Sequence, residues 1–125
     1  MITADQLLCH AIGDYVLQSD WMATEKTKRS LAAGVHVLAY SVPFLFLQPS
    51  LAAWLVIVST HFVIDRWRLA RYVVWAKNLP ATPPWRECTA TGYPPDRPAW
   101  MAVWLLIIAD NVLHVLINGL ALRYL

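Results

Sequence analysis

The chain has 125 residues, of which 58% are hydrophobic and 14% are charged, and its mean hydropathy is +0.46. Soluble domains usually carry about a quarter charged residues, so this composition argues against a soluble enzyme. The formal net charge is only +2, with no long basic run to neutralise a phosphate backbone, which argues against nucleic-acid binding. The length suits a single domain covering residues 1–125.

Four hydrophobic segments follow one another, each approaching the ~20 residues that a helix needs to cross a bilayer. They cover residues 3–22, 31–48, 50–74 and 99–122. The first segment carries Asp5, His10 and Asp14 and has no basic residues before it, so we expect it to be retained rather than cleaved as a secretory signal. The sequence therefore predicts an all-α fold, a four-helix transmembrane bundle.

Prolines and aromatic residues mark the connections between these segments. Pro43 lies inside the second segment and should kink it, while residues 78–98 hold six of the eight prolines and should form a loop before the fourth helix. Residues 66–77 are amphipathic and include Trp67 and Trp75. We expect them to form an extension of the third helix in the headgroup layer, with the bilayer exit near Asp65.

Lys and Arg residues predict the orientation of the segments. The first connection carries Lys26, Lys28 and Arg29, and the second carries none. Around the third connection lie Arg66, Arg68, Arg71, Lys77, Arg86 and Arg97. The positive-inside rule places the first and third connections in the cytoplasm and both termini outside.

Ionisable residues inside the hydrophobic segments are the most informative feature of the sequence. Inserting one charged side chain at the centre of a membrane-spanning helix costs about 2.5–3.5 kcal/mol, so such residues are rarely kept without a partner or a function. Three of the four histidines have an Asp four residues away, which places each pair on one face of a helix. The full set is His10, Asp14, His36, His61, Asp65, Asp110 and His114.

Imidazole and carboxylate groups together are the ligands that Zn²⁺, Mn²⁺ and Fe²⁺ prefer. Seven of them exceed one tetrahedral site and suit a pair of ions about 3.5–4 Å apart, with open positions for water. We therefore predict that all seven bind one or two divalent ions, zinc first, and that Asp14, Asp65 and Asp110 also take part in catalysis. Two alternatives stay open: structural His–Asp pairs between helices, and a proton or ion pathway.

Neighbouring polar residues extend the same helix faces. Gln18 continues the stripe of Asp14, and Arg68 follows Asp65 by three residues, so we interpret both as substrate contacts. For Arg68, anchoring at the membrane surface is an equally good interpretation. Tyr40 and Asn118 follow histidines by four residues and could orient the ligands.

These motifs carry a resemblance over nearly the whole chain. The chain resembles a domain-of-unknown-function family of small bacterial and phage integral-membrane proteins. The resemblance lies in three motifs: His10-x-x-x-Asp14-x-x-Leu17-Gln18, His61-Phe62-x-Ile64-Asp65-x-x-Arg68 and Asp110-Asn111-x-Leu113-His114. The resemblance implies residence in a bacterial inner membrane, or in a host membrane if a phage encodes the chain. The setting of His and Asp in apolar helices is also similar to that of membrane-bound metal-dependent hydrolases.

The residues and the resemblance together favour a metal-dependent hydrolase that acts on a lipid or an amphiphilic ester at the cytoplasmic face. Membrane lipids are the expected partners, alongside further copies of the chain or another membrane protein. The alternative is a non-enzymatic membrane protein, either a transporter of protons or divalent ions or a helper of another membrane protein. Cys9 and Cys88 are expected to be free thiols.

Overall fold

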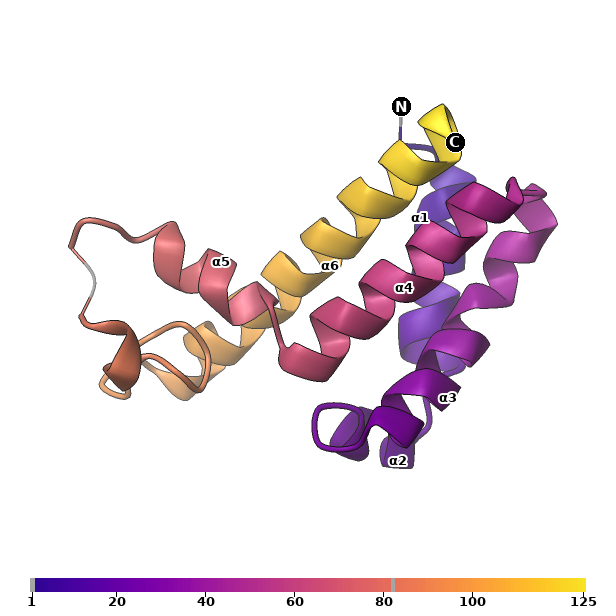
Figure 1. The fold of residues 1–125 in the computed structure, drawn as a ribbon. Coiled ribbons are helices and arrows are strands. Elements are labelled where there is room, and N and C mark those ends of the chain that lie inside the picture. The colour runs from indigo at the N-terminus through magenta and orange to yellow at the C-terminus, as the bar shows by residue number, and fades with distance from the viewer. Residues whose placement is uncertain (1, 82) are drawn as a thin grey trace. The chain divides into compact units, whose positions relative to one another are not determined.

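The computed structural model describes residues 2–81 and 83–125. All regular secondary structure among these residues is helical, and no strand occurs among them. Six α-helices form this part of the chain, together with one π-helix and two 3₁₀-helices. They are α1 (Ala4–Ala11), η1 (π, Ile12–Val16), α2 (Asp20–Glu25), α3 (Ser30–Ser41), η2 (3₁₀, Pro43–Leu47), α4 (Leu51–Trp67), α5 (Ala70–Ala76), η3 (3₁₀, Trp85–Glu87) and α6 (Ala99–Tyr124) (Figure 1).

The chain divides into two compact units. The first unit comprises residues 1–67 and 114–125, and therefore contains α1 to α4 and the C-terminal part of α6. The second unit comprises residues 68–113, with α5, η3, the proline-rich loop and the N-terminal part of α6. The expected all-α class is confirmed.

The first expected span is not one continuous helix. Thr3 caps α1, and the helix passes into the π-helix η1, which ends at Val16. Ser19 then accepts a hydrogen bond from the amide of Met22 and starts α2 as a separate helix. A side-chain cap of this kind fixes a helix start, because it satisfies an amide that has no partner in the first turn. The segment therefore consists of one continuous helix, α1 with η1, and the separate helix α2.

The second expected span combines α3 with η2. Pro43 has no amide hydrogen and stands at the start of η2, so the α-helical pattern gives way there to a 3₁₀ turn. The kink predicted at this proline is present. Gln48 follows in the left-handed conformation, with φ of 50°, and ends the segment before α4.

The third expected span ends earlier than the sequence indicated. α4 stops at Trp67, and Arg68 adopts a left-handed conformation with φ of 52° before α5 begins at Ala70. The amphipathic stretch is therefore a separate helix of the second unit and not an extension of α4. A non-glycine residue at positive φ interrupts the helical hydrogen-bond ladder, which explains the break.

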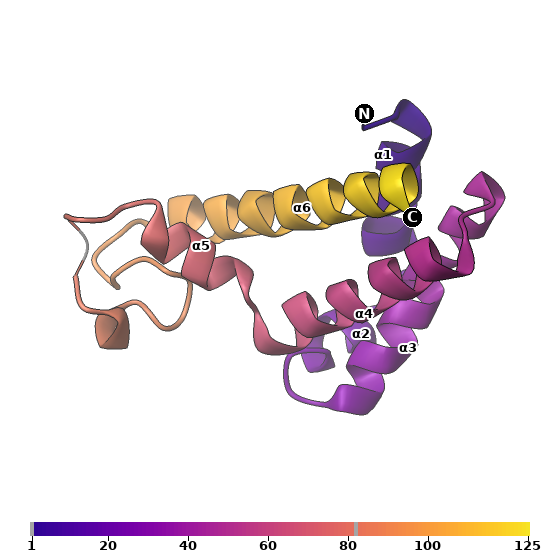
Figure 2. The same cartoon turned by 45° about the horizontal axis from the view of Figure 1, so that its top comes forward.

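The core of the first unit lies among α1, α3, α4 and the end of α6. It is built around six buried side chains: Cys9, Tyr40, Phe44, Ala53, Ile57 and Ala121. Gly13 lets η1 approach α3 closely, because a Cβ atom there would lie 2.5 Å from Cδ2 and 2.9 Å from the carbonyl oxygen of Tyr40. Figure 2 shows α1, α3 and α4 from a second direction.

The second unit is held together by contacts between α5 and the proline-rich loop. Trp75 donates to the carbonyl of Pro83 at 3.1 Å, and Arg71 donates to the carbonyl of Thr89 at 2.8 Å. Gly92 has φ of 86° and packs against α5, where a side chain would collide with Val74. Cys88 is buried in this loop and Cys9 is buried in the first unit, and both are free thiols.

Two segments are long and apolar enough to cross a membrane: Ser30–Leu47 and Ala99–Tyr124. The other described helices do not meet that standard, so the expected bundle of four spanning helices is not confirmed. α4 has 17 residues, and α1 has only eight. Large hydrophobic side chains are nevertheless exposed throughout the first unit, including Leu31, Phe46 and Leu51.

Candidate metal centre

Four polar side chains from three helical elements converge in the interior of the first unit. Asp14 comes from η1, His36 from α3, and His61 and Asp65 from successive turns of α4. All four residues are buried. π-helical turns are uncommon in proteins, and those that occur are often found at functional sites. In this chain the π-helix η1 carries Asp14.

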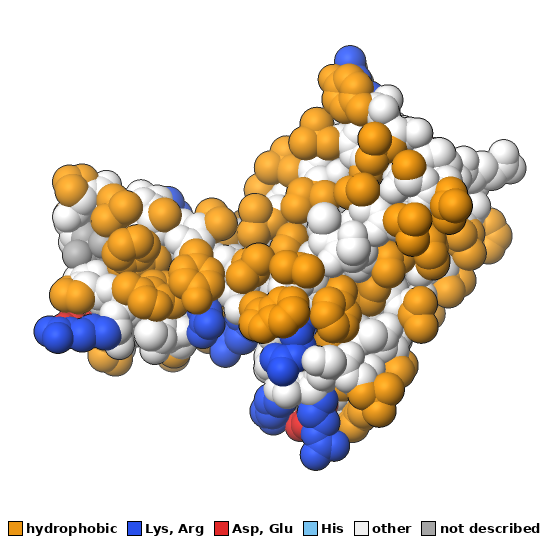
Figure 3. Space-filling view, in the orientation of Figure 1, with side chains coloured by type: hydrophobic (Ala, Val, Ile, Leu, Met, Phe, Trp, Pro, Cys, Tyr) orange, Lys and Arg blue, Asp and Glu red, His pale blue; other side chains and the backbone are white. Residues whose placement is uncertain are grey.

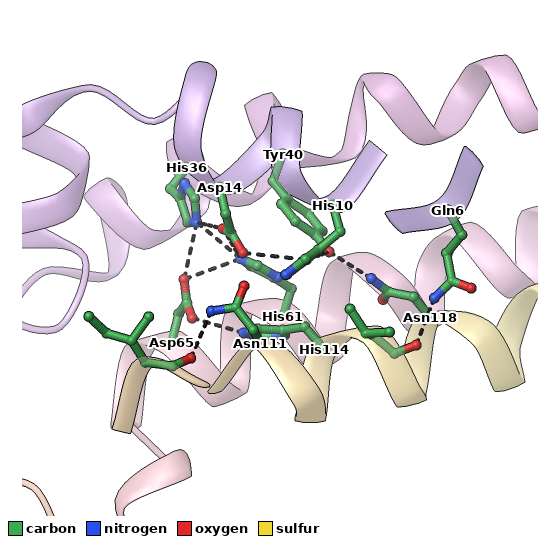
Figure 4. Close-up of polar contacts among 12 residues, drawn as sticks. Gln6, His10, Asp14, His36, Tyr40, His61, Asp65, Asn111, His114 and Asn118 are labelled. Carbon is green, nitrogen blue, oxygen red and sulfur yellow. Dashed lines mark hydrogen bonds and ion pairs between the residues drawn. The ribbon is translucent and has the colours of Figure 1, made fainter. Parts of the chain in front are cut away.

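The four side chains present one ligand atom each to a common point (Figure 4). Nε2 of His36 and Nε2 of His61 are 3.0 Å apart. Oδ1 of Asp14 lies 3.3 Å from the first nitrogen and 3.4 Å from the second. Oδ2 of Asp65 lies 3.1 Å and 3.2 Å from the same two nitrogens. Two nitrogens and two oxygens therefore form a compact group, called the four-atom group below, in which each oxygen lies close to both nitrogens.

Hydrogen bonds alone do not account for this group. Each imidazole nitrogen carries at most one hydrogen and an ionised carboxylate carries none, so at most two hydrogens serve these five contacts. Oδ1 of Asp14 is buried and makes no hydrogen bond within the described part of the chain. A cation at the centre would use the lone pairs of all four atoms at once.

The spacing of the four atoms also suits a metal ion. Zinc binds imidazole nitrogen at 2.0–2.1 Å and carboxylate oxygen at 2.0–2.2 Å, so its tetrahedral ligands lie about 3.3–3.6 Å apart. The five separations run from 3.0 to 3.4 Å, and most of them are slightly shorter than this spacing. Small outward movements of the side chains would accommodate an ion. The buried His and Asp groups could thus hold a divalent metal.

A cation of the chain itself already contacts this group. Nζ of Lys26, in the link after α2, lies 2.7 Å from Oδ2 of Asp65 and 3.4 Å from Nε2 of His36. Its side chain is only 17% exposed. From sequence, Lys26 served only to orient the segments by the positive-inside rule, because the position of a charge along the chain does not reveal that the link folds back over the cluster.

The aromatic rings around the centre form a stack. Tyr40 stacks on His61 with ring centroids 3.7 Å apart, and His61 stacks on His114 at 4.0 Å. His114 also places Nε2 3.2 Å from Oδ1 of Asp65, the oxygen that the four-atom group does not use. Asp65 therefore joins the group to α6 through its second oxygen.

His10 lies beside the four-atom group and not within it. Its Nδ1 contacts the hydroxyl of Tyr40 at 2.9 Å and Oδ2 of Asp14 at 3.5 Å. The amide of Asn118 donates to the same hydroxyl at 2.6 Å. These contacts connect α1, α3 and α6, and they hold Tyr40 against His61. His10 thus supports Asp14 and Tyr40 from the side.

Gln6 is a supporting residue that the sequence analysis did not single out. It is buried on α1 and donates from Nε2 to the carbonyl of Val115 at 2.6 Å, which ties α1 to α6. Gly119 faces the Gln6 side chain and leaves room for it. A buried amide needs partners of this kind, but a single Gln in an apolar helix gives no indication of which backbone group it will reach.

Three residues predicted from sequence are not members of the four-atom group. Asp110 is half-buried on α6 in the second unit, one helical turn before His114. Arg68 is exposed at the break between α4 and α5, also in the second unit. Gln18 lies in the link between η1 and α2, and its Oε1 is buried with no hydrogen-bond partner among residues 2–81 and 83–125.

A family model described as "Protein of unknown function (DUF3307)" matches residues 2–118 of the chain. The chain belongs to this family. All residues of the four-atom group fall within the matched range. Neither the curated proteins nor the solved structures contain a match to the chain. The bacterial and phage distribution expected from the motifs stays a prediction.

Proposed function

We propose that the protein is an integral-membrane metal-dependent hydrolase that acts on a lipid or an amphiphilic ester at the cytoplasmic face. The observation that carries this proposal is the four-atom group of Asp14, His36, His61 and Asp65, whose five close contacts exceed the two hydrogens available to them. A divalent ion explains those contacts and the buried oxygen of Asp14 that makes no hydrogen bond.

Placement in a membrane is supported by the apolar surface of α6 and of the first unit. Only 11% of the apolar window in α6 is buried, whereas the core helix of a soluble protein would be mostly buried. Large exposed apolar areas of this kind mark contact with a membrane or another protein. In Figure 3, hydrophobic side chains cover most of the visible face of this unit, and its Lys and Arg side chains gather where α2 and its link to α3 lie.

The basic residues at the same end of the first unit support placing the site at the cytoplasmic face of the membrane. Lys28 and Arg29 are exposed there and both pair with Glu25. The positive-inside rule assigns such an end to the cytoplasm. Lys26, in the same link, contacts the four-atom group, so the proposed centre would open toward that side.

The chemistry follows from the nature of the ligands. Two imidazoles and two carboxylates suit zinc, and manganese and iron use the same ligand types. A divalent ion held by all four would need a fifth coordination position for water, and it would then supply a Lewis acid that activates this water for ester hydrolysis. Asp14 and Asp65 would hold the ion and accept the proton.

The test combines metal content with hydrolysis. Protein purified without chelator should contain at least one divalent ion per chain and hydrolyse a lipid or amphiphilic ester, and His61→Ala should lose both properties. Ser59→Ala is the matched control on α4, because Ser59 is exposed and bonds only to carbonyls of its own helix. Metal-bound protein that moves protons or divalent ions across liposomes, without hydrolysis, would replace the hydrolase by a transporter.

A further inference from the structure

Lys26 is the cation that the first unit turns toward the four-atom group. Its side chain is 17% exposed, whereas those of Lys28 and Arg29 in the same link are 64% and 70% exposed. Lys28 and Arg29 pair with Glu25 at the surface, while Lys26 reaches Asp65 at 2.7 Å. Two of the three cations in this link thus lie at the surface, and the third, Lys26, contacts the four-atom group.

The link is fastened in a way that keeps Lys26 in place. Arg66, one residue after Asp65, donates from Nη1 to the carbonyl of Thr27 at 2.7 Å and from Nε to the hydroxyl of Ser30 at 3.3 Å. These bonds attach both sides of the link to α4. A long, flexible lysine side chain loses much rotamer freedom when it is held, so such fixation indicates a specific position for the ammonium group.

The charges around the centre decide which ligand it favours. In the metal-bound state both histidines are neutral, so the two carboxylates and the one ammonium contribute a net charge of one negative unit before the ion is counted. A divalent ion reverses this to one positive unit. An uncompensated charge in a buried site is costly, so the metal-loaded centre favours an anion over a neutral molecule.

Lys26 can contact such an anion without leaving Asp65. Each carboxylate oxygen has two lone pairs, so Oδ2 of Asp65 can face an ion and accept from Lys26 at the same time. The ammonium group has three hydrogens, and two of them remain for a ligand. An oxygen bound next to the ion would therefore lie within reach of Lys26, and phosphate oxygens are strong acceptors for lysine.

We propose that Lys26 recognises a phosphate group, and hence that the substrate is a phosphate ester and not a neutral carboxylic ester. The proposal rests on the metal-dependent hydrolase put forward above and specifies its substrate class. In the reaction, water forms a new P–O bond, the ester P–O bond breaks, and a proton passes to the leaving alcohol. Lys26 would hold the non-bridging oxygens and add positive charge where negative charge accumulates.

The experiment uses the full chain in phosphatidylcholine nanodiscs, loaded with Co²⁺ as a visible reporter of the metal site, and inorganic phosphate as the probe. Phosphate should change the cobalt absorption spectrum of the wild type. Lys26→Met should bind cobalt but weaken phosphate binding by at least about tenfold, because it removes a charge-assisted hydrogen bond. Lys26→Arg should retain most of the phosphate affinity, and Lys28→Met, the exposed control, should match the wild type.

Nanodiscs that also contain phosphatidic acid identify the source of the phosphate. Competition between this lipid and inorganic phosphate assigns the site to a lipid headgroup, and undiminished phosphate binding assigns it to a water-soluble phosphate ester. Cobalt binding with no spectral response to either form of phosphate, or with equal phosphate affinity in Lys26→Met, would overturn the role of Lys26 while leaving the metal centre intact. Failure to bind cobalt at all would instead remove the proposed function on which this inference depends.

Discussion

Gly13 offers a way to move Asp14 without altering any proposed metal ligand. In Gly13→Ala, the new Cβ would lie 2.5 Å from Cδ2 of Tyr40 and 2.9 Å from its carbonyl oxygen. Restoring an ordinary contact of 3.4 Å requires these atoms to separate by about 0.5–0.9 Å. Asp14 is the next residue along η1 and should move with it. Metal ligands hold their distances within about 0.2 Å, so the carboxylate should lose its position.

The expected magnitude has two parts. Overpacking of a buried contact costs about 1–3 kcal/mol of unfolding free energy, and displacing a supporting or ligating group lowers metal affinity by about 10–100-fold. Unfolding in detergent measures the first part, and competition with a coloured chelator measures the second. Gly34→Ala on α3 is the matched control, because a Cβ there meets nothing within 4 Å. It should leave metal affinity unchanged and stabilise the helix by up to about 1 kcal/mol. Gly13→Ala with wild-type stability and metal affinity would refute the reasoning.

Three further predictions concern the support of the centre, its metal and its orientation. Tyr40→Phe removes the hydroxyl that His10 and Asn118 contact but keeps the ring that stacks on His61. It should lower the free energy of unfolding in detergent by about 1–3 kcal/mol and the metal affinity by about tenfold. An unchanged metal affinity would show that this hydroxyl does not position the centre. At a free metal concentration one hundred times the Kd of the centre, bound metal should add about 2.7 kcal/mol to the free energy of unfolding. Removal of the metal by a chelator should therefore lower the Tm, and an unshifted Tm would contradict metal binding. Cysteines introduced at Lys28 and at Arg123 should react with a membrane-impermeant thiol reagent from the cytoplasmic and the outer side, respectively; labelling of both from one side would exclude the proposed orientation.

Hydrophobic periodicity identified some elements well and others poorly. The fourth segment, predicted over residues 99–122, forms the continuous helix α6 over Ala99–Tyr124, because few polar side chains interrupt its apolar pattern. The kink at Pro43 follows from the missing amide hydrogen and was predictable. The breaks at Ser19 and Arg68 were not predicted, because a cap and a left-handed residue depend on local backbone hydrogen bonds that composition does not reveal.

The candidate site was predicted in its residue types more than in its geometry. His–Asp spacing of four residues marked the pair on α4, and the structure brings that pair together with Asp14 and His36. His10 was predicted to bind metal as His36 does, but its ring contacts Tyr40 beside the group. Spacing along one helix shows which residues share a face, but it does not show which of them reach the same point across several helices. The position of Lys26 depends on the fold of an irregular link, for which periodicity carries no information.

X-ray absorption spectroscopy of the purified protein at the edge of its bound metal tests the central claim most directly. We predict a divalent ion with two imidazole nitrogens and two carboxylate oxygens at about 2.0–2.2 Å, and loss of one nitrogen in His36→Ala. A protein that takes up no divalent ion, or an ion whose spectrum is the same in His36→Ala and the wild type, would contradict it.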